Sequence, residues 1–212
     1  MTDRNTLGSK NAVFDVSVRI RMAMDAGVDW IQLREKDLSS RDLLALAREA
    51  VEYSKRKIQS LDVRVIVNDR LDVALAADAG GVHLGSKSLK PDEVVGWCRG
   101  GNAAADFLVG VSCHRLNEAR DAESAGASYI FFGPVFDTPS KRAFGQPQGM
   151  LRLAEVCSAV GVPVIAIGGV DEGNAAECLH AGAAGIAGIR MFQEPETKEA
   201  LAAKIERLRR PC

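Results

Sequence analysis

The most constraining feature of this 212-residue chain is an alternation of short apolar runs with stretches of helical periodicity. Apolar residues at helical spacing, such as Val16, Ile20 and Met24, predict helices in the intervals between the runs. Ser39 followed by Asp42 is a plausible capping box at the start of one helix. The expected strands are Trp30–Leu33, Val63–Val67, Gly81–Leu84, Phe107–Val111, Tyr129–Phe132, Val164–Ile167 and Gly185–Ile189.

A weak internal repeat supports this organisation. Ala-Gly pairs occur at 26–27, 79–80, 125–126 and 181–182, each where a helix closes before a strand. Glycine suits the left-handed position that ends a helix. The spacing of about fifty residues corresponds to two strand–helix units.

Alternating strands and helices without a hairpin signal predict an all-parallel sheet. Seven strand–helix units favour a (β/α)8 TIM barrel over a doubly wound sheet, because no G-x-G-x-x-G motif follows an early strand. The missing strand would be the first, since residues 1–10 are polar and the first helix begins near Asp15. We therefore expect an α/β barrel with a truncated first strand, forming a single domain over residues 1–212.

Composition excludes several classes of protein. The net charge of −1 gives no general attraction to nucleic acid or acidic membranes. No run of about 18 apolar residues predicts a membrane span, and the N-terminus lacks the apolar core of a signal peptide. The five cysteines are scattered and odd in number, which favours free thiols in a reducing cytoplasm over a zinc site.

Polar residues follow the first two expected strands. In a barrel, the carboxyl ends of the strands converge on one mouth, where the chemistry is placed. Strand alternation predicts that Gln32, Arg34 and Lys36 point to the same side, although a surface salt-bridge cluster with Glu35 is a competing interpretation. Asp69 is either a candidate Mg²⁺ ligand or a cap of the following helix.

The loops after later strands indicate an anion site. One strand opens into Thr138, Ser140 and Lys141, which supply two hydroxyls and an ammonium. The last two strands end in Gly168-Gly169 and in Ile189-Arg190, where small residues let backbone amides approach a phosphate. The cations Arg34, Lys36, Lys141 and Arg190 then predict a substrate with two phosphorylated groups.

Six segments, in order and at fitting spacing, resemble the thiamine phosphate synthase and thiazole tautomerase superfamily. They are Ile31–Lys36, Val67–Arg70, Gly81–Gly85, Gly110–Ala119, Gly133–Lys141 and Ile165–Gly169. The resemblance implies a transferase of thiamine biosynthesis that couples 4-amino-2-methyl-5-pyrimidinylmethyl diphosphate to thiazole phosphate. Diphosphate is released, and Mg²⁺ is the implied cofactor.

The resemblance also implies residue roles. Gln32 would hold the pyrimidine, Asp69 would bind Mg²⁺, and Ser112 would lie near the reaction. Diphosphate neutralisation would fall mainly to Lys141. The remaining diphosphate-binding residues would be Arg34, Lys36, Asn68, Thr138 and Ser140, and those for the thiazole phosphate would be Gly169, Ile189 and Arg190.

Three positions depart from the family pattern. Ser88 stands where the family has a second aspartate for Mg²⁺, and Arg190 stands where many synthases have serine. The initial residues 2–4, Thr-Asp-Arg, match the end of the family's first strand, which indicates a truncated start. Two alternatives therefore stay open: a metal-independent thiazole tautomerase that uses His114, and a catalytically silent paralogue that binds thiazole or thiamine phosphates. The sequence leaves homo-oligomer formation open.

Overall fold

The computed structural model describes residues 1–7, 12–56, 63–138 and 146–209. They form an α/β fold in two compact units, Met1–His83 with Ile189–Arg209, and Leu84–Gly188. The strands are β1 (Trp30–Leu33), β2 (Arg64–Asn68), β3 (Gly81–Leu84), β4 (Leu108–Cys113), β5 (Tyr129–Phe132), β6 (Val164–Ile167) and β7 (Gly185–Ala187). The α-helices are α1 (Ala12–Ala26), α2 (Ser40–Arg56), α3 (Leu71–Ala76), α4 (Pro91–Trp97), α5 (Leu116–Ser124), α6 (Gly149–Ala159), α7 (Ala175–His180), α8 (Arg190–Gln193) and α9 (Lys198–Arg209). Two shorter helices are the 3-10 helix η1 (Arg4–Leu7) and a π-helical turn, η2 (Cys98–Asn102).

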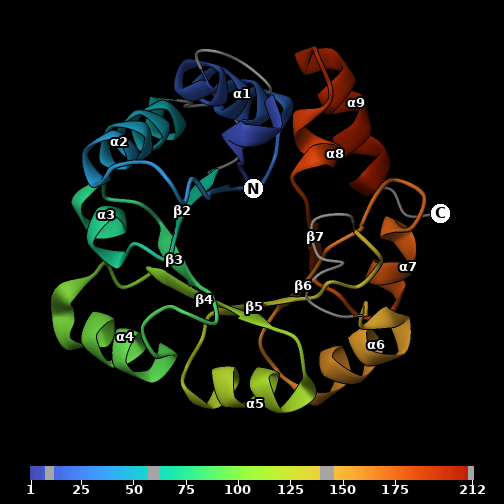
Figure 1. Ribbon diagram of the computed structural model, residues 1–212. Helices are drawn as coiled ribbons and strands as arrows, with labels where there is room; N and C mark the ends of the chain where they lie inside the picture. Colours follow the sequence, from blue (N-terminus) through green and yellow to red (C-terminus); the bar gives the residue numbers. More distant parts are fainter. Residues whose placement is uncertain (8–11, 57–62, 139–145, 210–212) are drawn as a thin grey trace. The chain divides into compact units, whose positions relative to one another are not determined.

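In the first unit, β1, β2 and β3 are parallel neighbours in chain order, with Ile31 opposite Val65 and Asn68 opposite His83. Helices α1, α2 and α3 lie outside these strands, and α9 packs beside α1 (Figure 1). Val16 of α1 and Leu201 of α9 are fully buried, as apolar positions at helical spacing require. The core of this unit therefore lies between its strands and their covering helices.

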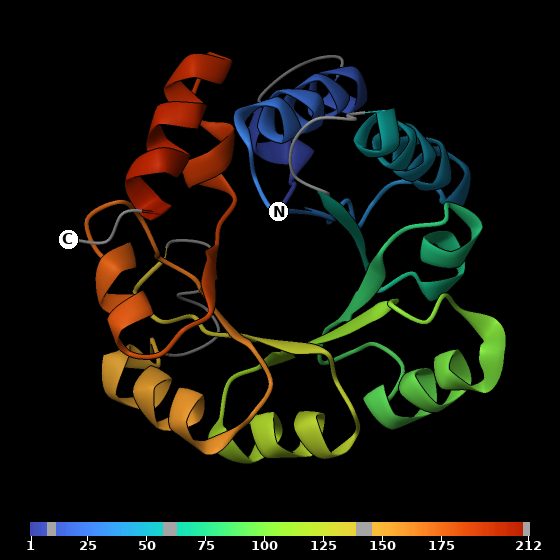
Figure 2. The same cartoon turned by 180° about the vertical axis from the view of Figure 1, so that it is seen from behind.

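The second unit repeats this plan with β4 to β7, which are also parallel and in chain order. Helices α4 to α7 cover the outer side of these strands (Figure 2). Tyr129 and Phe132 of β5 are among the largest fully buried side chains. A Cβ atom on Gly110 would lie 2.1 Å from the Tyr129 ring, so the glycine provides the space that this ring occupies.

The helix ends match the expected repeat with one exception. Gly27, Gly126 and Gly182 have φ angles of 94°, 86° and 98°, in the left-handed region that glycine adopts without strain. After α3, Asp78 takes this conformation with φ 54°, so the expectation for Gly80 is wrong. Aspartate tolerates the left-handed region better than most residues.

The predicted cap of α2 is present in modified form. The Oγ atom of Ser39 accepts a hydrogen bond from the Asp42 backbone N–H at 3.2 Å. The carboxylate of Asp42 accepts from the Ser39 hydroxyl at 2.7 Å, whereas a full capping box would engage the Ser39 backbone N–H.

The strand predictions are confirmed in type and order. β1, β3, β5 and β6 have the predicted bounds, whereas β2 is shifted by one residue and β7 ends early at Ala187. β4 begins one residue later than predicted, at Leu108, and extends to Cys113. No strand precedes α1 within residues 1–7, where η1 follows the first three residues. The parallel α/β class is thus established, and the eight-stranded barrel stays a prediction.

Two further expectations concern membranes and cysteines. Across the described ranges, no helix combines the length and the apolar character needed to cross a bilayer. Cys98, Cys113, Cys157 and Cys178 are free thiols, as the scattered spacing predicted.

Candidate active site

In the first unit, the candidate site begins at a buried amide. Gln32 of β1 is 5% exposed, and its Nε2 donates a hydrogen bond to Oδ1 of Asn68, the last residue of β2, at 3.1 Å. The Oε1 atom of Gln32 is buried and has no hydrogen-bond partner among the residues that the structure describes. A buried unsatisfied acceptor is costly, so this atom is suited to receive an N–H group from a ligand.

His83 of β3 lies opposite Asn68 and is 1% exposed. Burial lowers the pKa of His83 to about 3, and the positive charge of Arg34 adds to this effect. The imidazole is therefore neutral at physiological pH. It adds no positive charge beside Arg34, whose side chain is half-buried.

Asp69 follows β2 in a backbone conformation unusual for a residue other than glycine. Its φ angle is 68°, and its N–H donates to the carbonyl of His83 at 2.8 Å. The helix α3 has Arg70 at its N-cap position and no side-chain cap, so the helix-capping alternative for Asp69 is wrong. The carboxylate is exposed, and a left-handed residue at a strand end often marks a functional position.

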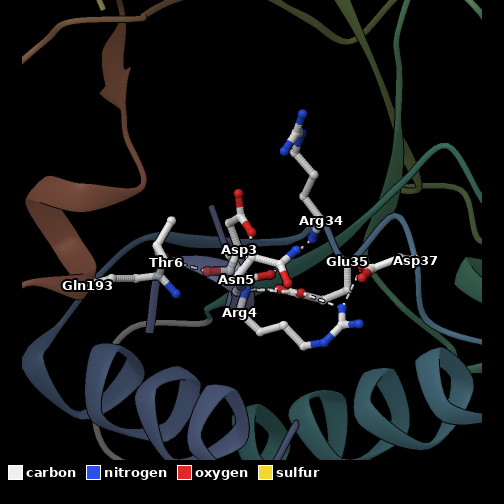
Figure 3. Close-up of polar contacts among 9 residues, drawn as sticks. Asp3, Arg4, Asn5, Thr6, Arg34, Glu35, Asp37 and Gln193 are labelled. Carbon is white, nitrogen blue, oxygen red and sulfur yellow. Dashed lines mark hydrogen bonds and ion pairs between the residues drawn. The ribbon is translucent and has the colours of Figure 1, made fainter. Parts of the chain in front are cut away.

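The sequence interpretation of Glu35 as part of a surface cluster is also wrong. The Glu35 side chain is 1% exposed, and its Oε2 accepts from Nη1 of Arg4 at 3.1 Å. Figure 3 shows the Arg34 side chain pointing away from this ion pair. Strand alternation separates Arg34 from Glu35, but a local pattern could not identify Arg4 as the partner, 31 residues away.

Other residues of the first unit lie where the strand ends place them. Lys36 is exposed beyond the end of β1, Ile189 is the half-buried N-cap residue of α8, and Arg190 opens that helix with an exposed side chain. Their roles toward phosphate groups stay predictions.

In the second unit, the loop after β5 pairs with the loop after β6. The N–H groups of Val135 and Phe136 donate to the carbonyls of Ile167 and Gly168, both at 2.9 Å. Gly169 has φ 70°, and a Cβ atom there would lie 2.7 Å from both Cβ of Phe136 and the carbonyl oxygen of Asp137. The two loops therefore fit together only because residue 169 lacks a side chain.

Of the two predicted hydroxyls after β5, the structure describes that of Thr138 but not that of Ser140. Thr138 is 6% exposed and follows directly on the segment that contacts Gly169. Ser140 and Lys141 lie outside the described residues, so their roles stay predictions from the sequence.

His114 and Ser112 belong to the end of β4. Ser112 is half-buried and lies opposite Phe131 in the register of β4 and β5. Nδ1 of His114 contacts the Gly133 carbonyl, and because a carbonyl can only accept, Nδ1 must carry the proton. This hydrogen bond leaves Nε2 as the basic nitrogen of the ring.

Ser88 has a local contact of its own. Its Oγ accepts a hydrogen bond from the Gly85 N–H at 2.7 Å, which closes the turn after β3. Among the described residues, no group of three or more His, Cys, Asp or Glu side chains could hold a metal ion. Asp69 is the predicted metal-binding carboxylate that the structure does describe.

Both units follow one plan, in which each parallel strand leads to a helix and polar residues lie at the carboxyl ends of the strands. This plan defines the class of parallel α/β enzymes with a TIM-like fold.

Comparison with known proteins gives the family. The profile described as thiamine monophosphate synthase matches residues 9–192. The thiamine-phosphate synthase of Roseiflexus sp. (strain RS-1) is 40% identical over 189 residues, covering 89% of this chain and 75% of the relative. That of Syntrophomonas wolfei subsp. wolfei is 34% identical over 208 residues, covering 98% of this chain and 93% of the relative. The solved thiamine phosphate pyrophosphorylase from Pyrococcus furiosus has a TM-score of 0.80 and 31% identity, covering 98% of this chain and 91% of that one.

The chain belongs to the thiamine monophosphate synthase family. It is an enzyme of the transferase type, as the six sequence segments predicted.

Proposed function

We propose that this protein couples 4-amino-2-methyl-5-pyrimidinylmethyl diphosphate to thiazole phosphate and releases diphosphate. The observation that carries the proposal is the buried Oε1 atom of Gln32, which has no partner in the described part of the chain. Asn68 holds the other end of the same amide, so the acceptor is oriented before a ligand arrives. The exocyclic amine of an aminopyrimidine supplies the N–H donor that this acceptor lacks.

The charges near Gln32 suit a departing diphosphate. Departure leaves an electron-deficient pyrimidine methyl group, so the protein must neutralise the leaving group more than it needs a strong base. Arg34 provides a guanidinium fork for this purpose. Because His83 is neutral, it adds no second positive charge beside that of Arg34. From the sequence resemblance alone, we also assign Lys36, Thr138, Ser140 and Lys141 to the diphosphate and Ser112 to the neighbourhood of the reacting atoms.

The residues fit Mg²⁺ as a cofactor. Asp69 presents an exposed carboxylate on a backbone held in place by the bond to His83. Mg²⁺ commonly uses one or two protein carboxylates and takes its other ligands from phosphates and water. The ion would supply charge neutralisation for the leaving diphosphate, and Ser88 would not replace the second carboxylate.

We assign the thiazole phosphate to the loop after β6, as the family resemblance implies for Gly169. The space that Cβ atoms would take at Gly168 and Gly169 is filled by Pro134 and Phe136, so any contact with the phosphate would come from the backbone of this loop. The assignment of Ile189 and Arg190, which belong to the first unit, to this phosphate rests on the sequence resemblance alone. The free thiols of the described cysteines support the proposed location in a reducing cytoplasm.

The test is a coupling assay with both substrates, with and without Mg²⁺. Asp69→Asn removes the proposed ligand charge while keeping a residue that tolerates φ 68°. Asp78→Asn is the matched control, because Asp78 is also an exposed aspartate in the left-handed region. We expect Asp69→Asn to abolish Mg²⁺-dependent coupling and Asp78→Asn to leave it within about twofold of wild type, the range of a surface substitution. Absence of coupling in wild type, together with metal-independent tautomer exchange, would overturn the proposal.

A further inference from the structure

Residues 2–6 form a strap across the end of β1, and nothing in the proposed chemistry accounts for them. The N–H of Thr2 donates to the carbonyl of Gln32 at 2.8 Å, and the N–H of Arg34 donates to Oγ1 of Thr2 at 3.0 Å. In a parallel ladder, a backbone carbonyl would accept this second bond. The Thr2 hydroxyl takes that place, so the chain can leave the ladder after Thr2 and enter η1 at Arg4.

The second anchor of the strap is a buried ion pair. The backbone N–H of Arg4 lies 3.2 and 3.1 Å from the two carboxylate oxygens of Glu35. The Arg4 guanidinium also donates to Glu35 at 3.1 Å and to Asp37 at 2.7 Å. Figure 3 shows Arg4 between these two carboxylates. The Arg4 hydrogen bond holds the pKa of the Asp37 carboxyl below its ordinary value.

Arg34 stands between the two anchors. Its own N–H is bound by Thr2, and the next residue along the chain, Glu35, is bound by Arg4. The Arg34 side chain extends away from the ion pair (Figure 3). The strap therefore fixes the backbone from which the guanidinium reaches outward, and none of the strap's hydrogen bonds among the described residues involves the guanidinium itself.

We propose that residues 2–6 are a positioning strap, in which Thr2 and Arg4, the latter through its partner Glu35, set the affinity for the diphosphate-bearing substrate by fixing the backbone of Arg34. This inference rests on the proposed function, and Thr2, Arg4 and Glu35 act through the backbone of Arg34 and are not assigned to the substrate. Catalytic geometry is sensitive to small displacements, since a shift of about 1 Å can cost about a hundredfold in rate. A strap that fixes one cationic residue should act on one substrate only.

The experiment compares variants of the strap in the full-length enzyme. Thr2→Val keeps the shape of the side chain but removes the acceptor, whereas Thr2→Ser keeps the acceptor. Arg4→Ala removes the ion pair, and Arg4→Lys restores a cation. The measurements are calorimetric binding of inorganic diphosphate in the presence of Mg²⁺, and KM for each of the two substrates.

The control is Arg209→Ala. Arg209 anchors the opposite end of β1 by donating to the Gly27 carbonyl at 2.8 Å and to Asp29 at 2.7 Å. Its loss should lower the melting temperature without changing diphosphate affinity, because the amino ends of barrel strands serve stability.

We expect Thr2→Val and Arg4→Ala to weaken diphosphate binding at least about tenfold and to raise KM for the pyrimidine diphosphate, with KM for thiazole phosphate unchanged. Thr2→Ser should match wild type, and Arg4→Lys should recover part of the loss. Unchanged diphosphate affinity in Thr2→Val, or an equal rise in both KM values, would overturn the proposed positioning role of the strap while leaving the proposed function intact. Wild type that neither couples the substrates nor binds diphosphate would instead overturn the proposed function.

Discussion

Gly169→Ala tests whether the two loops of the second unit must fit together for activity. Gly169 has φ 70°, and an alanine held in the left-handed region costs about 1–2 kcal/mol. The new Cβ atom would lie 2.7 Å from Cβ of Phe136 and from the carbonyl oxygen of Asp137. Ordinary contact begins at 3.4 Å, so the segment that leads to Thr138 must move by about 0.7 Å or remain overpacked. Overpacking typically adds about 1–3 kcal/mol, which gives a total of about 2–5 kcal/mol.

The matched control is Gly149→Ala. Gly149 has φ 77° but no atom within 4 Å of the position that a Cβ would occupy. Its alanine variant should therefore lose only the conformational part, about 1–2 kcal/mol. The N–H of Gly149 donates to Val135 at 3.0 Å, and alanine preserves this bond.

Urea unfolding and steady-state coupling, measured on both variants, separate the effect of backbone strain at the glycine from that of displacing the segment that leads to Thr138. We expect Gly169→Ala to lose more stability than Gly149→Ala, and its coupling rate to fall by about tenfold to a hundredfold as Thr138 moves. Gly149→Ala should couple the substrates at nearly the wild-type rate. If the two variants are equally stable and equally active, the contact between these loops has no part in the site.

Three further predictions address single side chains. Lys141→Ala should lower the coupling rate at least about a hundredfold, measured at saturating substrates, because the positive charge that we assign to the leaving diphosphate from the sequence would be lost. His114→Asn places an amide donor near the Nδ1 position, where it can keep the hydrogen bond to the Gly133 carbonyl, whereas His114→Gln places the donor near Nε2. The Asn variant should therefore retain more coupling activity than the Gln variant. Equal losses of activity would indicate that His114 transfers a proton and does not act through this hydrogen bond. Because the folded pKa of His83 is about 3, below its ordinary 6.5, its contribution to stability is present above pH 6.5 and is lost as the pH falls toward 3. In urea titrations, the free energy of unfolding of His83→Gln should therefore fall less between about pH 6.5 and 5 than that of wild type, by up to about 2 kcal/mol.

The sequence was sufficient to predict the strands because burial in a parallel sheet leaves a continuous apolar run. Val82 and Leu84 of β3 and Ile130 of β5 illustrate this, since each is almost fully buried. The bounds were less certain at β2, where Asn68 is a polar residue that the ladder includes. Polar residues at strand ends therefore belong to the sheet and the candidate site at once.

Features that depend on distant contacts could not be predicted. Nothing near Glu35 in the sequence identifies Arg4 as its partner. Asp69 combines a left-handed backbone with a hydrogen bond to the carbonyl of His83, and the sequence alone could not choose between a Mg²⁺ ligand and a helix cap at this position. The unpartnered Oε1 acceptor of Gln32 could not be predicted either, because the orientation of this amide depends on its hydrogen bond to Asn68 on the neighbouring strand.

The hydroxyl of Thr2 also bears on solubility. Within its unit, β1 pairs with β2 on one side only, and an exposed strand edge is a template for pairing with other chains. Thr2 satisfies both the Gln32 carbonyl and the Arg34 N–H on the other side, and the chain continues into η1 at Arg4. A single residue therefore occupies two of the backbone groups of β1, a carbonyl and an N–H, through which another chain could pair with this strand. Thr2→Val would leave the Arg34 N–H without its acceptor, and the variant should aggregate faster than Thr2→Ser on mild heating.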